Sequence, residues 1–363
     1  MKTVVVGLSG GVDSSVAAFL LKKQGYRVIG LHMRGENVET READEKRVRS
    51  LCDDMGIECV VVDYKDHMQI VKDYFVREYL AGRTPNPCVM CNKEVKFKPF
   101  LTVMEELNAD YFATGHYAIV EHTENGHFLK KAVDEDKDQS YFLCGLSQEQ
   151  ISKVLFPLGE LTKAEVRHIA LENNLITKDT KESYDICFLG SQKFKDFMNE
   201  NYPEKHGKIV DVETKKVVGS HTGISKYTIG QRRGLNIGGV KGVEGNRWFV
   251  VEKDVKNNTL YVCCGESEKQ LASGCVVEGF NWINKPEKNQ FDAFVKLRYH
   301  QADQAVKVIV KSEAVVNLEF KEEQRSVTLG QFAVLYDENG VCLGGGEIRV
   351  VGGLLNGDLR CKA

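Results

Sequence analysis

The first two hundred residues alternate between short apolar runs rich in β-branched side chains and longer segments with helical spacing of apolar positions. The short runs predict buried strands, and the longer segments predict helices. Strands that alternate with helices favour a parallel sheet covered on both faces. We therefore expect an α/β domain over residues 1–203, with one ligand cleft at the carboxyl ends of the strands. The expected strands are Thr3–Gly7, Arg27–Met33, Glu58–Asp63 and Asp110–His116.

The pattern changes after about Lys205. Glycine becomes frequent, and short alternating runs such as RWFVVEKDV and AVKVIVK follow one another with turn signals between them. This texture is typical of all-β structure. We expect a small β-rich linking domain over residues 204–270 and a carboxyl-terminal β-barrel over residues 271–363.

Length and composition limit the class of protein. With 363 residues, 42% hydrophobic and 28% charged, the chain has the composition of a soluble protein of two or three domains. It contains no apolar run of membrane-spanning length and does not begin like a signal peptide, so we expect a cytoplasmic protein without a membrane partner. Eleven irregularly spaced cysteines then indicate reduced thiols, metal ligands or catalysis. The net charge of -3 means that a nucleic acid would be held by local basic patches.

The stretch LSGGVDSS, from Leu8 to Ser15, joins the first expected strand to an apolar helix. Two glycines permit a tight turn, and successive N–H groups and hydroxyls can then face an anion at the positive end of the helix. A phosphate is the expected anion. The loop lacks the lysine of a G-x-x-x-x-G-K-[ST] motif, so it is not the usual P-loop. The alternative is a simple glycine turn with Asp13 as a helix cap.

A second candidate site contains cysteines. Cys88 and Cys91 occupy the proline-rich stretch TPNPCVMCN, which we expect to be a loop before a helix that begins near Asn92. The helix terminus and nearby lysines should stabilise a thiolate there. A third cysteine, Cys187, lies in another polar segment, KESYDICFLG. Inert buried thiols are expected at Cys59, Cys144, Cys263, Cys264, Cys275 and Cys342.

Two levels of resemblance follow from these motifs. SGGVDS resembles the loop of the PP-loop ATP pyrophosphatases, which bind the pyrophosphate of ATP and transfer AMP to an oxygen. Further motifs, in order and from Met1 nearly to the carboxyl end, resemble those of the tRNA-specific 2-thiouridylase family. They are TPNPxxxCN followed by KFK, ATGHY, KDQSYFL, DICFLG, TIGQRRGL, LRYHQAD and CLGGGEI.

The resemblance implies a reaction. Members of that family use ATP with Mg²⁺ to adenylate O2 of the wobble uridine (U34) in tRNAs for lysine, glutamate and glutamine, releasing diphosphate. Sulfur carried as a cysteine persulfide then replaces that oxygen, and AMP leaves. By position, Cys91 corresponds to the family's nucleophile and Cys187 to its persulfide carrier. The implied partners are tRNA and a sulfur donor protein, either a cysteine desulfurase or a sulfur relay protein.

The resemblance also implies two binding sites. The ATP site would be formed by Gly7, Leu8, Ser9, Gly10, Gly11, Val12, Asp13, Ser14, Met33 and Gly115. The tRNA site would be formed by Asn86, Pro87, Cys88, His116, Lys137, Asp138, Gln139, Arg298, Tyr299 and Gln331. Within the latter set, Lys137–Gln139 resemble a segment that contacts tRNA, and the polar run VDEDKD before Gln139 predicts a mobile surface loop. The pair Arg298–Tyr299 suits an unstacked base. An exposed basic turn containing Lys226, Arg232 and Arg233 would add phosphate contacts.

The chain departs from the family pattern at Cys88, where an aspartate is usual. This departure leaves a cofactor question open, because Cys88, Cys91 and Cys187 could instead hold a [4Fe-4S] cluster that delivers the sulfur. Zinc would suit three thiolates less well without a fourth ligand such as His116. Two other functions stay open from the residues: a PP-loop synthetase that amidates a carboxylate, and a metal- or cluster-containing RNA-binding protein with a regulatory nucleotide site.

Overall fold

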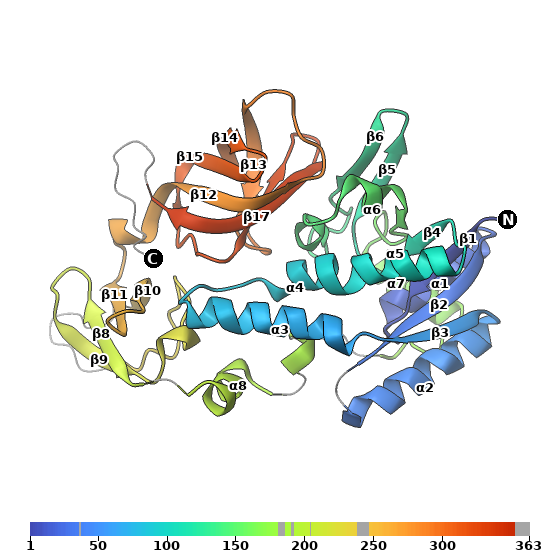
Figure 1. Cartoon of the computed structure of the whole chain (residues 1–363), viewed down its shortest axis with the longest axis horizontal. Helices are drawn as coiled ribbons and strands as arrows, with labels where there is room; N and C mark the ends of the chain where they lie inside the picture. Colours follow the sequence, from blue (N-terminus) through green and yellow to red (C-terminus); the bar gives the residue numbers. More distant parts are fainter. Residues whose placement is uncertain (36–37, 181–185, 190–191, 204, 238–246, 353–363) are drawn as a thin grey trace.

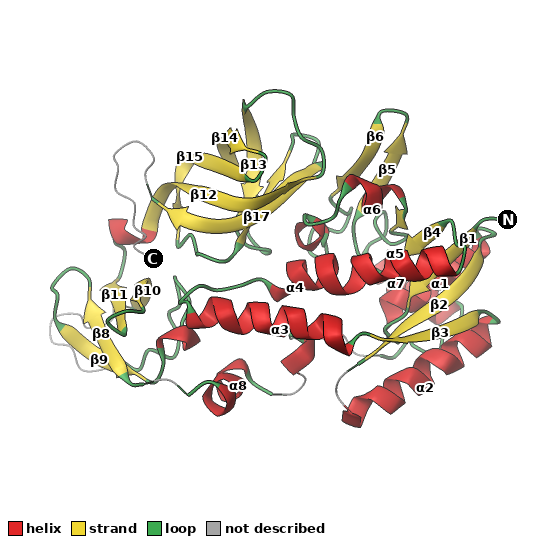
Figure 2. Cartoon of the chain, viewed as in Figure 1, coloured by secondary structure: helices red, strands yellow, loops and turns green. Residues whose placement is uncertain are grey.

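The computed structural model describes residues 1–35, 38–180, 186–189, 192–203, 205–237 and 247–352. Over these residues the chain forms an α/β domain, a small sheet and a closed barrel (Figure 1). The longer helices lie in the first part of the chain, and the second part is mostly strand (Figure 2). The fold class expected from the sequence is therefore confirmed. No helix in the described ranges is long and apolar enough to cross a membrane.

The sheet of the α/β domain contains five parallel strands. They are β1 (Thr3–Gly7), β2 (Arg27–Arg34), β3 (Glu58–Asp63), β4 (Tyr111–Ala113) and β7 (Val154–Leu155). Their order is β3-β2-β1-β4-β7, so β1 is central and pairs with both β2 and β4. Four of these strands match the expected ones, and β7 was not expected. The glycine loop after β1 consequently starts in the middle of the sheet.

Helices cover both faces of this sheet. The longer ones are α1 (Val12–Lys23), α2 (Val38–Met55), α3 (Lys65–Leu80), α5 (Lys98–Glu106) and α7 (Lys163–Glu172). The shorter ones are α4 (Pro87–Met90), the π-helix η1 (Cys91–Phe97), η2 (Ser140–Leu143), α6 (Gln148–Ser152), η3 (Cys187–Leu189) and α8 (Phe194–Asn201). Val4 and Val6 of β1 pack in one apolar cluster with α1, α2 and α7, whereas Val5 packs in another with η1 and α5. This alternation is the period-two pattern of a strand buried on both faces.

The remainder of the chain is built from strands. A hairpin of β5 (Ile119–Thr123) and β6 (Gly126–Lys130) projects from the first domain. The small sheet consists of β8 (Gly207–Asp211), β9 (Val217–His221), β10 (Trp248–Asp254) and β11 (Thr259–Cys264), in the order β10-β11-β8-β9. Two short helices, η4 (Ile224–Lys226) and η5 (Glu268–Gln270), follow β9 and β11 in the sequence. The barrel closes in the order β12-β15-β14-β13-β16-β17. Its strands are β12 (Leu271–Trp282), β13 (Gln290–Lys296), β14 (Gln304–Ser312), β15 (Val315–Arg325), β16 (Phe332–Tyr336) and β17 (Cys342–Val351).

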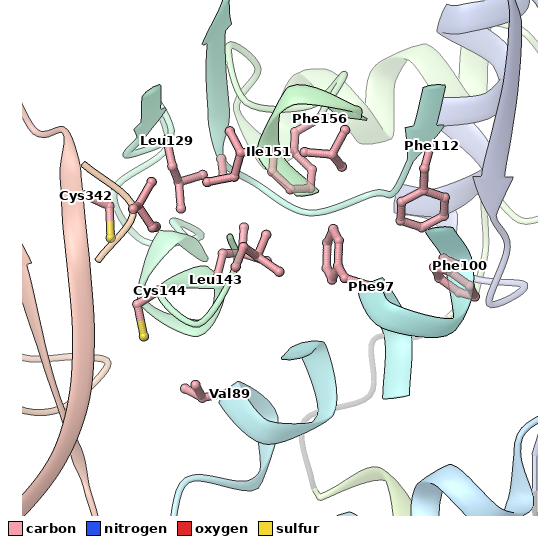
Figure 3. Packing of buried hydrophobic residues seen from close by; sticks show 14 of the residues in the cluster. Val89, Phe97, Phe100, Phe112, Leu129, Leu143, Cys144, Ile151, Phe156 and Cys342 are labelled. Atoms are coloured by element: carbon pink, nitrogen blue, oxygen red, sulfur yellow. The ribbon is translucent and has the colours of Figure 1, made fainter. Parts of the chain in front are cut away.

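One apolar core continues from the α/β domain into the barrel. Figure 3 shows Val89 and Phe97 in this cluster together with Leu143, Cys144 and, from the barrel, Cys342. These five side chains are almost completely buried. Burial of apolar side chains at this density stabilises the contact by about 1.5–3 kcal/mol for each large side chain. The helices α4 and η1, which carry two of the candidate cysteines, are therefore packed against the barrel.

A buried ionic network also connects the α/β domain to the barrel, through α3 and β17. The side chain of Glu78, near the end of α3, is only 2% exposed and accepts hydrogen bonds from Arg83 at 2.5 Å and from Arg349 of β17 at 3.0 Å. One turn earlier, the hydroxyl of Tyr74 donates to Glu347 of β17 at 2.5 Å. A buried carboxylate requires such partners, because an unpaired charge would be costly to bury. The network thus ties α3 to the last strand of the barrel.

Candidate active site

The glycine loop presents the amino terminus of α1. Gly10 adopts a φ of 78°, in the left-handed region that favours glycine, and Gly11 is the N-cap residue. The hydroxyls of Ser14 and Ser15 donate back to the carbonyl of Gly11, at 3.1 and 2.8 Å. Within the described residues, no side chain caps the first turn of α1. Its N–H groups and the helix dipole are therefore available to an anion, as the sequence predicts.

Gly115 allows a second loop to touch the first. A Cβ atom at this position would lie 2.7 Å from both the carbonyl carbon of Asp13 and the amide nitrogen of Ser14. Only a residue without a side chain fits at that separation. Two residues later, the hydroxyl of Tyr117 donates to the carboxylate of Asp13 at 2.9 Å. The loop after β4 therefore forms a second wall of the anion site.

The candidate cysteines begin a helix rather than lie in a loop. Asn86 is the N-cap of α4, its side-chain oxygen accepts from the amide of Val89 at 3.4 Å, and Pro87 occupies the first turn. These are ordinary helix-start signals, and they correct the expectation of a loop up to Asn92. Cys88 lies in α4, and Cys91 is the first residue of the π-helix η1. Short π-helical segments are frequent at functional sites.

Cys91 and Cys187 are brought together although they lie far apart in the chain. Cys91 is buried in a small cluster that also contains Phe188, the residue after Cys187. The two thiols interact, because each one shifts the pKa of the other. Cys187 itself is exposed, as is Cys88. The buried thiol is therefore paired with one that solvent and macromolecules can reach.

The interaction between the two thiols shifts their pKa values in opposite directions. It lowers the pKa of Cys187 to about 6, with help from Lys96 and against the effect of burial. The same interaction, followed by burial, raises the pKa of Cys91. Burial also raises the pKa of Cys88, with Lys96 acting in the opposite direction. Lys96 lowers the pKa of both Cys88 and Cys91, as the sequence predicts for nearby lysines, but burial at Cys88 and the interaction with Cys187 at Cys91 outweigh it.

Met33 connects the two parts of the site. It lies near the end of β2, where a ligand cleft was expected, and packs against the cluster that contains Cys91. Gly7 and Leu8, which lead into the glycine loop, are adjacent to this strand, since the amide of Leu8 donates to the carbonyl of Leu31 at 2.8 Å. A nucleotide on the loop and the thiol pair would therefore share one wall.

Comparisons with known proteins agree with this arrangement. Three family models match consecutive parts of the chain: a tRNA methyl transferase HUP domain over residues 2–191, a tRNA methyl transferase PRC-barrel domain over residues 195–264, and an aminomethyltransferase beta-barrel domain over residues 272–348. The chain is 46% identical over 354 residues to the tRNA-specific 2-thiouridylase MnmA of Alkaliphilus oremlandii, covering 95% of this chain and 96% of that one. It is 47% identical over 359 residues to the protein of the same name from Oceanobacillus iheyensis, covering 96% and 95%. The chain belongs to the tRNA-specific 2-thiouridylase family.

Among solved structures, the U34-tRNA thiolase NcsA from Methanococcus maripaludis with its [4Fe-4S] cluster matches 56% of this chain and 67% of that one. The identity is 24% and the TM-score is 0.35. A likeness of this size has no bearing on whether this 2-thiouridylase family member holds a cluster.

The thiols of this family member do not fit a metal cluster. In the described ranges, no group of three histidine, cysteine, aspartate or glutamate side chains is placed to hold a metal ion. Cys88, Cys91 and Cys187 all fall in those ranges and are free thiols that influence one another's pKa. His116, considered as a fourth zinc ligand, is buried beside Phe97 and Phe156 and bonds Thr114 at 2.6 Å. Burial lowers its pKa well below the usual value, so its imidazole is neutral.

The predicted tRNA-binding segment Lys137–Gln139 is not a plain surface loop. Asp138 is buried, and its carboxylate accepts from the amide of Ala132 at 3.1 Å and from the hydroxyl of Ser140 at 2.9 Å. The side-chain oxygen of Gln139 accepts from the amide of Tyr117 at 3.0 Å. The expectation of a surface loop is therefore wrong for Asp138, whose carboxylate is needed for these bonds. Gln139 instead supports the wall of the anion site.

The predicted tRNA contacts of the barrel have partners within the protein. The guanidinium of Arg298 donates to the carbonyls of Ile229 and Ser326, at 3.0 and 2.6 Å. The ring of Tyr299 lies 4.3 Å from that of Phe142, centroid to centroid. Both residues line a cavity of about 440 Å³ on the barrel, together with Leu297, His300, Gln301, Arg325, Ser326 and Val327. Their assignment to tRNA stays a prediction.

Two further residues differ from the sequence-based picture. Gln331 donates from its side-chain nitrogen to the carbonyl of Thr84 at 2.8 Å, so it holds the segment that leads into α4. Lys226, expected in an exposed basic turn, is buried and donates to the carbonyl of Thr222 at 2.6 Å. It is therefore a structural residue here. Arg232 and Arg233 are mostly accessible, as expected for phosphate contacts.

Sequence reasoning missed Lys163, whose ammonium group contacts the carboxylate of Asp13. The stretch LTKAE does carry a helix-start signal, since Thr162 and Glu165 form a capping box at the start of α7. That signal locates the helix. It does not indicate that the lysine after the cap reaches a loop near the amino terminus.

Proposed function

We propose that the protein is an ATP-dependent sulfurtransferase that converts the wobble uridine of tRNAs for lysine, glutamate and glutamine into 2-thiouridine. The observation that carries this proposal is the Cys91–Cys187 pair, which shares a wall with a glycine loop suited to the phosphates of ATP. The family models are described in terms of methyl transfer, whereas the relatives are named for thiolation. A thiolate beside a nucleotide loop supports sulfur transfer, because thiolates accept and deliver sulfane sulfur.

The first step is activation of the uridine. O2 of the base attacks the α-phosphorus of ATP, diphosphate leaves, and the oxygen becomes part of a good leaving group, AMP. The N–H groups at the start of α1 would stabilise the negative charge on the departing diphosphate. Mg²⁺ would accompany ATP and neutralise phosphate charge. We assign it no site on the protein.

The second step transfers sulfur. The Cys187 thiolate takes a sulfane sulfur from a donor protein, which fits its lowered pKa and its exposure. The terminal sulfur of the persulfide attacks C2, and AMP leaves with the original oxygen. Cys91 then attacks the sulfur of Cys187, which forms a Cys91–Cys187 disulfide and leaves the outer sulfur on C2. Alternatively, Cys91 attacks first and releases sulfide, which displaces AMP. Either route ends in a disulfide that needs two electrons from an external dithiol to reset.

Substitution of the two cysteines tests the proposal. Cys91→Ser and Cys187→Ser should each lower the rate of 2-thiouridine formation at least 100-fold with tRNA, ATP, Mg²⁺ and a cysteine desulfurase that supplies sulfane sulfur from cysteine, because either change prevents the disulfide-forming step. Both variants should still bind ATP. Cys264→Ser, at a thiol of the small sheet, is the control and should retain normal activity. Normal thiolation by either active-site variant would refute the assigned roles.

The same assay separates the other functions. A carboxylate-amidating synthetase would not depend on Cys91 or Cys187. An RNA-binding protein with a regulatory nucleotide site would release no diphosphate from ATP. Diphosphate release that requires tRNA, together with loss of thiolation in the serine variants, is expected only of the proposed function.

A further inference from the structure

Lys163 reaches the glycine loop from a distant part of the chain. Its Nζ atom lies 2.7 and 2.8 Å from the two carboxylate oxygens of Asp13, and its side chain is only 12% exposed. Asp13 lies in the first turn of α1, where the N–H groups face the expected phosphates. An ammonium group is thus placed at the mouth of the anion site.

The position of Lys163 is determined by its surroundings. It is the first residue of α7, directly after the capping box of Thr162 and Glu165. Its backbone amide donates to the carboxylate of Asp134 at 2.8 Å. Because the backbone is held at both points, the long side chain is directed to Asp13 from a rigid helix start rather than from a loop.

Tethering α1 to α7 does not account for this lysine. The two helices already pack through apolar side chains, with Val16 and Ala17 of α1 in one cluster with Val166 and Ala170 of α7. A carboxylate in the first turn of a helix is moreover stabilised by the helix dipole without a cation. Partial burial of an ammonium group costs free energy, and that cost is offset more fully when a polyphosphate ligand adds further negative charge.

The glycine loop itself lacks a lysine. LSGGVDSS has no counterpart of the P-loop lysine that contacts nucleotide phosphates. Backbone N–H groups and serine hydroxyls alone would have to compensate the charge of ATP and of the departing diphosphate. A lysine that arrives from α7 provides the missing charge at the same place.

We propose that Lys163 is the phosphate-binding lysine of the ATP site, which Asp13 holds in place until the nucleotide binds. On binding, the ammonium group contacts the phosphate oxygens, and the hydrogen bond from Tyr117 continues to orient Asp13. This inference rests on the proposed use of ATP. It adds a residue far from the glycine loop to the nucleotide site.

Direct binding measurements test the inference. In titration calorimetry, Lys163→Met should weaken the binding of ATP and of inorganic pyrophosphate about 10- to 100-fold, because one charge-assisted contact is lost. The affinity for adenosine should change less than threefold. Lys163→Arg, which keeps the charge, should bind ATP more tightly than Lys163→Met. The matched control is Lys153→Met, which removes a lysine that also faces two carboxylates, those of Glu105 and Glu149, elsewhere in the domain.

The outcomes separate two failures. If the wild-type protein does not bind ATP, the proposed function is wrong. If the wild-type protein binds ATP and Lys163→Met binds ATP equally well, Lys163 has only a structural role. The same conclusion follows if the variant loses as much affinity for adenosine as for ATP. Should Lys163→Met not fold, lysine-selective acylation of the wild-type protein provides the test. ATP should change the rate at which Lys163 is labelled several-fold, whereas adenosine should leave this rate unchanged. Equal labelling rates in the presence of ATP and of adenosine would overturn the inference.

Discussion

Replacement of Gly115 by alanine tests whether contact between the two loops of the ATP site controls nucleotide binding. The added Cβ would lie 2.7 Å from the backbone of Asp13 and Ser14, whereas ordinary contacts begin at 3.4 Å. One of the two loops must therefore move by about 0.7 Å. Neither contact is the flexible end of a side chain, so the backbone itself has to shift.

The size of the effect follows from hydrogen-bond geometry. An N–H···O bond of about 2.9 Å that lengthens by this amount falls outside the normal range. Loss of one charge-assisted bond to a phosphate costs about 2 kcal/mol, which corresponds to a ~30-fold weaker affinity. We expect Gly115→Ala to weaken ATP binding by that factor and to lower the thiolation rate at subsaturating ATP. The affinity for tRNA should change little.

Calorimetry with ATP is the assay, and thermal unfolding verifies that the variant is folded. Gly219→Ala in β9 is the matched control, because its added Cβ would meet neighbours no closer than 3.5 Å and lies in the small sheet. A folded Gly115→Ala protein that binds ATP within threefold of wild type would refute the reasoning. So would an equal loss of affinity in the control.

Two further predictions concern ionisable groups. Because the Cys91 thiol lowers the pKa of Cys187 to about 6, the alkylation rate of Cys187 should rise through pH 6 and level off by about pH 7.5. An inflection near the ordinary cysteine value of about 8.5 would contradict the interaction between the two thiols. Glu78→Gln should destabilise the protein by about 3 kcal/mol, because the guanidinium groups of Arg83 and Arg349, each 27% exposed, lose their buried carboxylate. The pKa of Glu78 is lowered, since Arg83 and Arg349 together outweigh burial, so its contribution is present above about pH 4.3 and lost at lower pH. Thermal unfolding should therefore show a smaller difference between variant and wild type at pH 3.5 than at pH 7.

The elements that sequence predicted well are those with local signals. β1 to β3 are short β-branched runs, and α1 follows two glycines, so periodicity and turn chemistry are sufficient to locate them. The glycine loop was found for the same reason, since all of its residues are consecutive. By contrast, β7 pairs through only Val154 and Leu155, and such a short strand has no recognisable period.

The parts that sequence missed depend on contacts between distant segments. The raised pKa of Cys91 could not be inferred from its neighbours in the sequence, because its main cause is the interaction with the distant residue Cys187. The sequence around Lys226 predicts an exposed cation, whereas in the structure this residue lies in η4 and is buried. Lys163 reads as a residue of an amphipathic helix, and only the packing of α7 on α1 brings it to Asp13. In each case the tertiary fold decides a property that local pattern leaves open.

Contacts between distant segments also connect the barrel to the helix α4. The amide of Thr84 donates to the carbonyl of Leu329 at 2.8 Å, and Gln331 donates back to the carbonyl of Thr84. Asn281 of β12 also donates to the carbonyl of Cys144 at 2.9 Å. The short helix that precedes Cys91 is too small to hold its own position, since an isolated turn of helix is marginal in water. The barrel therefore positions Cys91, and we expect substitution of Gln331 to disturb the segment that leads into this residue.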